Sequence, residues 1–234
     1  MARFRPSLSA TLLLLGLAAL FAALGAWQWQ RAAEKAARMA DFGAAHTVTG
    51  LPAPAQASEF TRVKLTGRFE TRRHVLADNR VLDGRTGVHV YTPFTESSGA
   101  TLLVNRGWLP LPASRLPLPP VPTAEEELAI SGRLGPIQEP GRQLGPAAEL
   151  DRQHWPQLVT YPSVERVAAA LGSELYPWVL YLDPDSAGGF GGRHWSPVYM
   201  TPQKHRAYAV QWYALALLGL VCWAVAGWRR GTEN

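Results

Sequence analysis

Two long apolar stretches without charged residues lie near the two ends of the chain. The second, Tyr208 to Trp228, has 21 residues, and a helix of that length covers about 31 Å, enough to cross a hydrocarbon core of about 30 Å. The first, Leu8 to Trp27, is longer than the apolar core of a cleavable signal peptide, about 7–15 residues. Cleavage after a site such as Ala22-Ala23 is an alternative, but the tryptophans that follow favour a retained anchor. We therefore predict transmembrane helices over 8–28 and 207–228.

The first helix has two further features. Gly16, Ala19 and Ala23 fall on one helical face, and small residues in register allow close approach of a second membrane helix. We therefore expect this face to contact the second span. Strong helix formers continue after the apolar stretch, which predicts a helical extension over 29–45.

Between the spans, from about Thr47, short apolar segments alternate with polar and turn residues. This pattern predicts strands that end near Phe69 and others at His74–Ala77, Gly87–Phe94, Thr101–Val104, Leu128–Leu134 and Trp178–Leu182. The segment Leu109 to Pro122 has six prolines and is expected to be an extended surface connection. The predicted fold is an integral membrane protein whose two terminal transmembrane helices flank one mainly-β (α+β) exterior domain, residues 46–203.

Turn and capping residues divide this exterior domain. Asp83-Gly84 and Asn105-Arg106-Gly107 are typical of hairpin turns. One helix is expected over Val164–Leu171, because Ser163 is a good N-cap and Gly172 a good stop signal.

The charge distribution argues for membrane topology rather than nucleic-acid binding. The net charge of +5 includes 19 basic and 17 acidic residues between the spans, so the exterior domain is nearly neutral. Both short tails carry arginine, which favours cytoplasmic termini, although Arg31, Lys35 and Arg38 pull the other way. The single cysteine, Cys222, lies inside the second span, so the sequence predicts no disulfide.

The exterior domain has no recognisable catalytic pattern. There is no G-x-S-x-G, H-E-x-x-H, C-x-x-C or glycine-rich phosphate loop. Asp183 and Asp185 precede a glycine pair, but the glutamate of a calcium loop is missing. The sequence therefore predicts a protein that is not an enzyme, and a membrane-tethered hydrolase has no nucleophile and base to support it.

The start of the second span carries the most distinctive chemistry. His205, Tyr208 and Trp212 fall at i, i+3 and i+7, so an imidazole and two aromatic rings are expected on one helical face at the lipid boundary. Lys204 and Arg206 flank the histidine. Two interpretations remain open at this point: a site for a flat, apolar, metal-bearing ligand, or an anchor helix whose polar end meets lipid headgroups.

Three motifs in order along the chain carry a family resemblance. They are Gly25-x-Trp27-Gln28-x-x-Arg31-x-x-x-Lys35, then Asp78-Asn79-Arg80 with Val104-Asn105-Arg106-Gly107-Trp108-Leu109-Pro110, then His205-x-x-Tyr208-Ala209-x-Gln211-Trp212. Together with the two-span frame, they resemble the surfeit locus protein 1 family, assembly factors for haem–copper cytochrome c oxidase. Tyr213 stands where the family usually has phenylalanine.

The resemblance implies that the chain binds or delivers haem a for insertion into subunit I, with His205 as the ligand of the haem iron. A histidine at the interface suits haem a, whose isoprenoid tail prefers lipid and whose propionates prefer water or cations such as Lys204 and Arg206. Tyr208 and Trp212 are the expected covers of the ring face.

The resemblance also implies partners and a location. The partners would be subunit I or an oxidase assembly intermediate, membrane lipid and, less directly, the haem a synthesis machinery. Nucleic acid is not expected as a partner, because the exterior domain is nearly neutral. The partner-contact candidates are Trp27, Arg31, Arg106 and Trp108. The location would be a bacterial inner membrane, with both termini cytoplasmic and the main domain periplasmic. The alternative function is an adaptor that stabilises an oxidase intermediate without binding haem.

Overall fold

The computed structural model describes residues 7–138 and 149–232, with side chains described as far as Trp228. The chain forms two compact units: residues 45–195 make one, and the two terminal segments together make the other.

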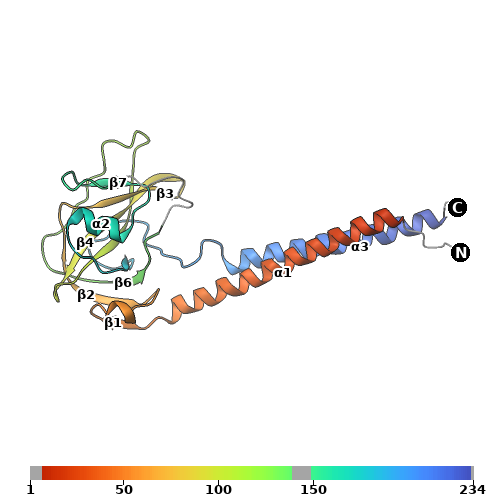
Figure 1. Ribbon diagram of the computed structural model, residues 1–234, viewed down its shortest axis with the longest axis horizontal. Coiled ribbons are helices and arrows are strands. Elements are labelled where there is room, and N and C mark those ends of the chain that lie inside the picture. Colours follow the sequence, from red (N-terminus) through yellow and green to blue (C-terminus); the bar gives the residue numbers. More distant parts are fainter. Residues whose placement is uncertain (1–6, 139–148, 233–234) are drawn as a thin grey trace. The chain divides into compact units, whose positions relative to one another are not determined.

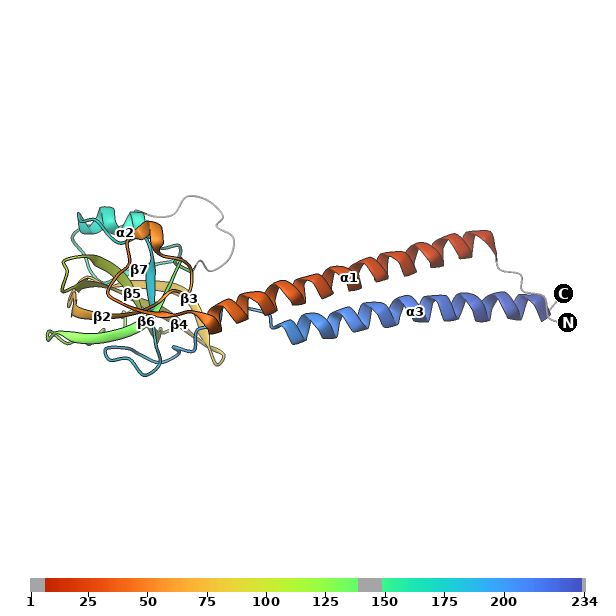
Figure 2. The same cartoon turned by 90° about the horizontal axis from the view of Figure 1, so that it is seen from below.

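The terminal unit consists of two long helices, α1 (Leu8–Ala44) and α3 (Pro202–Thr232). They run side by side in both views (Figures 1 and 2). Both are long and apolar enough to cross a membrane, and little of their apolar surface is covered within the protein. This is the arrangement expected of membrane anchors, because lipid solvates apolar side chains that water would not. The predicted pair of terminal helices is confirmed.

The second unit is mainly β. Within its described residues the strands are β1 (Thr47–Thr49), β2 (Arg62–Phe69), β3 (Val75–Leu82), β4 (Arg85–Glu96), β5 (Thr101–Pro110), β6 (Leu128–Gly135), β7 (Gln157–Val159) and β8 (Val179–Leu182), with a 3-10 turn η1 (Pro54–Gln56) and one helix, α2 (Val164–Leu171). Each of the six predicted strands corresponds to one of these elements. The short strands β1 and β7 were not predicted.

The sheet closes into a barrel. Its order is β1-β2-β6-β8-β5-β4-β3-β7, and an additional pairing of β2 with β4 joins five of these strands into a ring. At this closure Gly67 pairs with Glu96, and a Cβ on Gly67 would lie only 2.1 Å from the carbonyl oxygen of Thr95. Closure therefore needs a glycine here, because any side chain would push β4 away.

Two cores form on the two faces of the sheet. The inward residues of β2, including Val63, Leu65 and Phe69, join apolar side chains from the other ring strands inside the barrel. On another face, α2 packs Val164 and Val167 against apolar side chains of β3, β4, β5 and β8. Each buried face follows from the two-residue period of a strand or the 3.6-residue period of a helix.

The local signals at α2 and at the β3–β4 hairpin are confirmed. The Ser163 hydroxyl accepts a hydrogen bond from the backbone N–H of Arg166, and Gly172 ends the helix in the left-handed region with φ of 69°. Asp83 and Gly84 also have positive φ, 49° and 74°, as a two-residue hairpin turn of type I′ requires.

The predicted turn at Asn105-Arg106-Gly107 is wrong, because these residues lie inside β5. Tyr91 pairs with Asn105 and His89 pairs with Trp108, so one residue of β4 lies opposite two of β5. This is a β-bulge, and Gly107 supplies it with φ of 114°. A glycine that follows polar residues is typical of a bulge as well as of a turn, so the sequence does not distinguish the two. In the structure β5 continues through this point, and its Val104 and Asn105 pair with β8.

The proline-rich segment forms no strand after Pro110, as predicted. Its side chains still contribute to packing: Leu111, Leu118 and Val121 cover a third apolar cluster on β3 and β4. Arg115 fixes the segment further by pairing with the buried carboxylate of Asp78 at 2.7 Å.

Candidate functional site

The contact between α1 and α3 follows a seven-residue repeat. Ala18, Gly25 and Ala32 are the buried residues of α1, and Ala209 and Ala216 are buried on α3. Residues seven apart stay on one seam of a left-handed helix pair, and small side chains there let the two backbones approach closely.

The predicted contact face of α1 is therefore wrong. Gly16, Ala19 and Ala23 are exposed, and no atom would lie within 4 Å of a Cβ on Gly16. At Gly25, by contrast, a Cβ would lie 2.7 Å from the ring of Tyr213. The sequence has two stripes of small residues on α1, and the stripe through Ala18, Gly25 and Ala32 is the one that packs against α3.

Three polar and aromatic contacts fix the register of this helix pair. The indole N–H of Trp223 donates to the hydroxyl of Thr11 at 3.0 Å. The rings of Phe21 and Trp212 stack with centroids 5.6 Å apart. Gln28 lies seven residues after Phe21 on α1, and His205 lies seven residues before Trp212 on α3. The side chains of Gln28 and His205 are hydrogen-bonded to each other.

His205 lies in the first turns of α3 and is only 8% exposed. Its Nδ1 is 2.7 Å from the amide oxygen of Gln28. An amide oxygen can only accept a hydrogen bond, so this contact requires the proton on Nδ1, and in a neutral imidazole the lone pair is then on Nε2. In the described part of the chain Nε2 has no hydrogen-bond partner, and this nitrogen is not fully buried. It therefore reaches the surface of the helix pair.

The structure separates the predicted cofactor residues into two groups. His205 and Trp212 both face α1, and one side of the Trp212 indole is occupied by Phe21. Tyr208 is 44% exposed, and Lys204 and Arg206 are exposed as well. The contact with α1 follows the 205, 209, 212 and 216 positions, so Tyr208 lies outside that contact. The expected role of His205, Tyr208 and Trp212 in holding a ligand stays a prediction.

Sequence reasoning missed the partners of these two residues. Gln28 stood in a quoted motif without a role, and Phe21 was not considered. A sequence signal for these contacts was present. Phe21 and Gln28 are seven residues apart on α1, and His205 and Trp212 are seven residues apart on α3. In an antiparallel helix pair, equal steps of one heptad on both helices predict that the two residues of one helix face the two of the other.

The two partner-contact candidates on α1 lie at its surface. Trp27 is 53% exposed, which suits an interfacial tryptophan. Arg31 pairs with Glu34 at 2.7 Å, and the two side chains are 43% and 44% exposed.

Arg106 is not a surface residue, so its assignment as a partner contact is corrected. It is 2% exposed, lies between the rings of Phe69 and Phe190 at 4.7 and 4.5 Å, and donates to the carbonyl oxygens of Gly188 and Pro122. Burial lowers its pKa to about 10, which leaves the guanidinium charged at neutral pH. Its role is to hold the loop that follows β8 against the barrel.

The assignment of Trp108 as a partner contact is corrected for the same reason, its burial. It is 8% exposed, its indole N–H donates to the backbone carbonyl of Arg80 at 3.2 Å, and its ring packs where a side chain on Gly87 would be. The side chain joins β5 to β3 and β4 and offers almost no surface to a partner.

Buried titratable groups in the barrel unit also have structural partners. Burial, with a smaller contribution from Arg80, lowers the pKa of His89 to about 4, and the ring packs against the indole of Trp195. Burial likewise lowers the pKa of His74, whose ring nitrogens lie 3.0 Å from the Thr92 hydroxyl and 3.1 Å from the Thr71 carbonyl. Both imidazoles are therefore neutral at pH 7.

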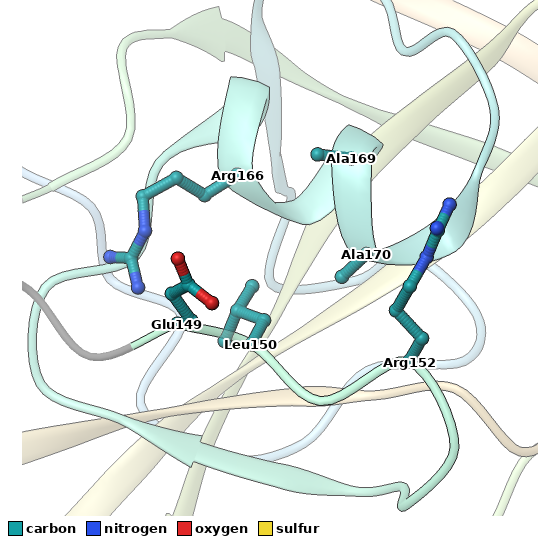
Figure 3. A pocket seen from close by; sticks show the side chains of 6 residues that line it. All are labelled: Glu149, Leu150, Arg152, Arg166, Ala169 and Ala170. Atoms are coloured by element: carbon teal, nitrogen blue, oxygen red, sulfur yellow. The ribbon is translucent and has the colours of Figure 1, made fainter.

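One hollow of about 530 Å³ lies beside α2 (Figure 3). Its lining is Glu149, Leu150, Arg152, Arg166, Ala169 and Ala170. This lining has no nucleophile paired with a base, and within residues 7–138 and 149–232 no three His, Cys, Asp or Glu side chains gather as a metal site.

Comparison with known proteins decides the family. A model of the SURF1 family matches residues 15–217, which is most of the chain. The chain belongs to the SURF1 family. SURF1 proteins are known as cytochrome oxidase assembly factors, and the two long apolar helices agree with a membrane protein.

The similarity to individual SURF1 proteins is moderate and extends over long alignments. Surfeit locus protein 1 of Takifugu rubripes is 25% identical over 223 residues, covering 86% of this chain and 89% of that protein. Surfeit locus protein 1 of Mus musculus is 25% identical over 230 residues, with 86% and 70% covered. An uncharacterised SURF1-like protein of Mycobacterium tuberculosis is 28% identical over 162 residues, covering 69% of this chain and 57% of that protein. The match thus spans just over half of the mycobacterial relative.

Proposed function

We propose that this SURF1 protein binds haem a at the membrane surface and supplies it to subunit I during cytochrome c oxidase assembly. The observation that carries the proposal is the state of His205. Its Nδ1 is held by Gln28 at 2.7 Å, so the lone pair is on Nε2, at the surface of the helix pair. A neutral imidazole with a free lone pair is a good ligand for haem iron.

The surroundings of His205 suit the rest of haem a. The apolar surface of α1 and α3 is uncovered and suits an isoprenoid tail. Lys204 and Arg206 are exposed on either side of the histidine, where they suit propionates. His205 also lies close to the N-terminus of α3, which begins at Pro202, and the positive end of a helix dipole attracts carboxylates.

The same proposal includes location and partners. The barrel unit would lie on the periplasmic side of a bacterial inner membrane, with both termini in the cytoplasm, because both tails carry arginine. Haem a would come from the synthesis machinery and pass to subunit I or to an assembly intermediate that contains it. When bound, haem a would supply an iron centre that an imidazole can ligate, and the role of this chain would be to bind and orient it.

An adaptor without haem is the second candidate, and a specific observation favours it. His205 is largely buried between the helices, and a hydrogen bond between Gln28 and His205 would by itself fasten two membrane helices. In this case the histidine would stabilise the anchor, and the barrel unit would carry the contacts to the oxidase.

The test uses a bacterial strain that makes haem a and lacks its own SURF1 protein. The residual oxidase is purified, and its haem a content per copper is measured after complementation with wild type, His205→Ala or His154→Ala. His154 is an exposed histidine of the barrel unit and provides a matched control. We expect wild type and His154→Ala to restore haem a content, and His205→Ala to leave it low at normal protein abundance. Full restoration by His205→Ala would favour the adaptor.

A further inference from the structure

Gln28 is half-buried in the seam directly opposite His205, and its role is open. Its amide oxygen lies 2.7 Å from Nδ1 of His205. Free histidine prefers to carry its single proton on Nε2, so a fixed acceptor at Nδ1 reverses the ordinary preference. The hydrogen bond at one ring nitrogen determines which nitrogen is left to bind a metal.

The helix pair holds this contact in place. Because the two helices are antiparallel, Ala32 and Ala209 lie on opposite sides of the pair, and both are almost fully buried, so the backbones are close on both sides. Further toward the chain termini, the stacked rings of Phe21 and Trp212 oppose a slip of register. A shift of one residue along either helix would separate Gln28 from His205, because successive residues are rotated by about 100°.

We propose that Gln28 is the positioning residue of His205: it holds the imidazole as the Nδ1–H tautomer, with the Nε2 lone pair directed out of the helix pair toward a haem iron. The tautomer is a property of the protein alone, whereas the part that concerns iron rests on the proposed function. Hydrogen-bond acceptors behind a ligating histidine commonly fix its orientation and raise its basicity, and their loss weakens metal binding about 10- to 100-fold.

Two substitutions and one control separate positioning from simple helix packing. Gln28→Leu removes the acceptor and keeps a side chain of similar size. Gln28→Glu keeps an acceptor of the same length and strengthens it. Gln30→Leu is the matched control, because Gln30 is the same residue type at an exposed position of α1.

The first measurement needs no haem. The full-length protein, labelled with ¹⁵N-histidine, is studied by NMR in nanodiscs, and the signals of His205 are assigned from their absence in His205→Asn. We expect the Nδ1–H tautomer in wild type, Gln28→Glu and Gln30→Leu, and a shift toward Nε2–H in Gln28→Leu. An unchanged tautomer in Gln28→Leu, or the Nε2–H tautomer in wild type, would overturn the inference.

The second measurement uses the same proteins purified from cells that make haem a. We expect Gln28→Leu to retain haem a about 10- to 100-fold more weakly than Gln30→Leu, and Gln28→Glu to retain it with a lowered reduction potential, because the carboxylate makes the imidazole a stronger donor. If the tautomer shifts as expected but no protein, including wild type, carries haem a, the proposed function fails and the iron part of this inference fails with it. If wild type carries haem a and Gln28→Leu carries it equally tightly, only the positioning role is wrong.

Discussion

The buried guanidinium of Arg106 provides a quantitative test of how the barrel unit is held together. Within the described residues, its hydrogen-bond acceptors are neutral: the carbonyl oxygens of Gly188 at 2.6 Å and Pro122 at 2.9 Å, the hydroxyl of Thr123 at 2.7 Å and, at the longer distance of 3.5 Å, the hydroxyl of Thr92. The substitution to study is Arg106→Met, because methionine retains apolar contact with Phe69 and Phe190 while it removes the charge and all donors.

The size of the effect follows from two opposing contributions. The three short hydrogen bonds from this charged donor, at about 2 kcal/mol each, give about 6 kcal/mol of stabilisation. Burial opposes them: a pKa lowered from 12.5 to about 10 corresponds to about 3 kcal/mol of cost for keeping the charge. We therefore expect Arg106→Met to lower the free energy of unfolding of the barrel unit by about 3 kcal/mol.

The assay is pulse proteolysis of the full-length protein in detergent across a urea series, which reports unfolding of the barrel unit. Arg68→Met is the matched control, because Arg68 is exposed on β2 and its loss is expected to change stability by less than about 0.5 kcal/mol. If Arg106→Met unfolds at the same urea concentration as Arg68→Met, the desolvation cost equals the hydrogen-bond gain and Arg106 does not stabilise the loop after β8.

Three further predictions follow from the helices and the barrel. Gly25→Leu should disrupt the pairing of α1 with α3 and lower the amount of intact protein in the membrane. Gly16→Leu should not, because of these two glycines only Gly25 lies against Tyr213. Equal amounts of both variants in the membrane would contradict the observed helix contact. The pKa of His89 is lowered to about 4 in the folded protein, so as the pH falls the unfolded chain takes up a proton before the folded chain does. The free energy of unfolding in urea should therefore fall by up to about 3 kcal/mol from pH 6.5 to 4 in wild type, and by less in His89→Gln. The same pH dependence in both proteins would refute this. A reporter that is active only outside the cytoplasm should be active when fused near Gly172 and inactive after Asn234, and the reverse would overturn the proposed topology.

Much of the fold could be predicted because its signals are local. The uncharged runs that became α1 and α3, the cap and stop at Ser163 and Gly172, and the Asp83-Gly84 turn each depend on neighbours in sequence. β1 and β7 were missed, since strands of three residues exist only because β2 and β3 offer parallel edges. The bulge at Gly107 was mistaken for a turn because pairing with distant strands, invisible in the sequence, decides between the two.

The site was predicted less completely for a related reason. The sequence placed His205 at the start of a membrane helix, but its face depends on which side of α3 meets α1. Side chains of both helices determine that choice jointly, so the contact of His205 with Gln28 was not predicted and Gln28 was left without a role. Arg106 and Trp108 were taken for surface residues because charge and a nearby glycine normally indicate a loop, whereas here neutral acceptors and aromatic rings bury them.

The most direct test of the central claim is the absorption spectrum of the purified protein from cells that make haem a. We expect wild type and His154→Ala to carry haem a with the spectrum of a histidine-ligated iron. His205→Ala, inserted at normal abundance, should lose the haem or show altered ligation. A His205→Ala protein with the wild-type spectrum and stoichiometry would contradict ligation by His205, and a colourless wild type would contradict haem binding altogether.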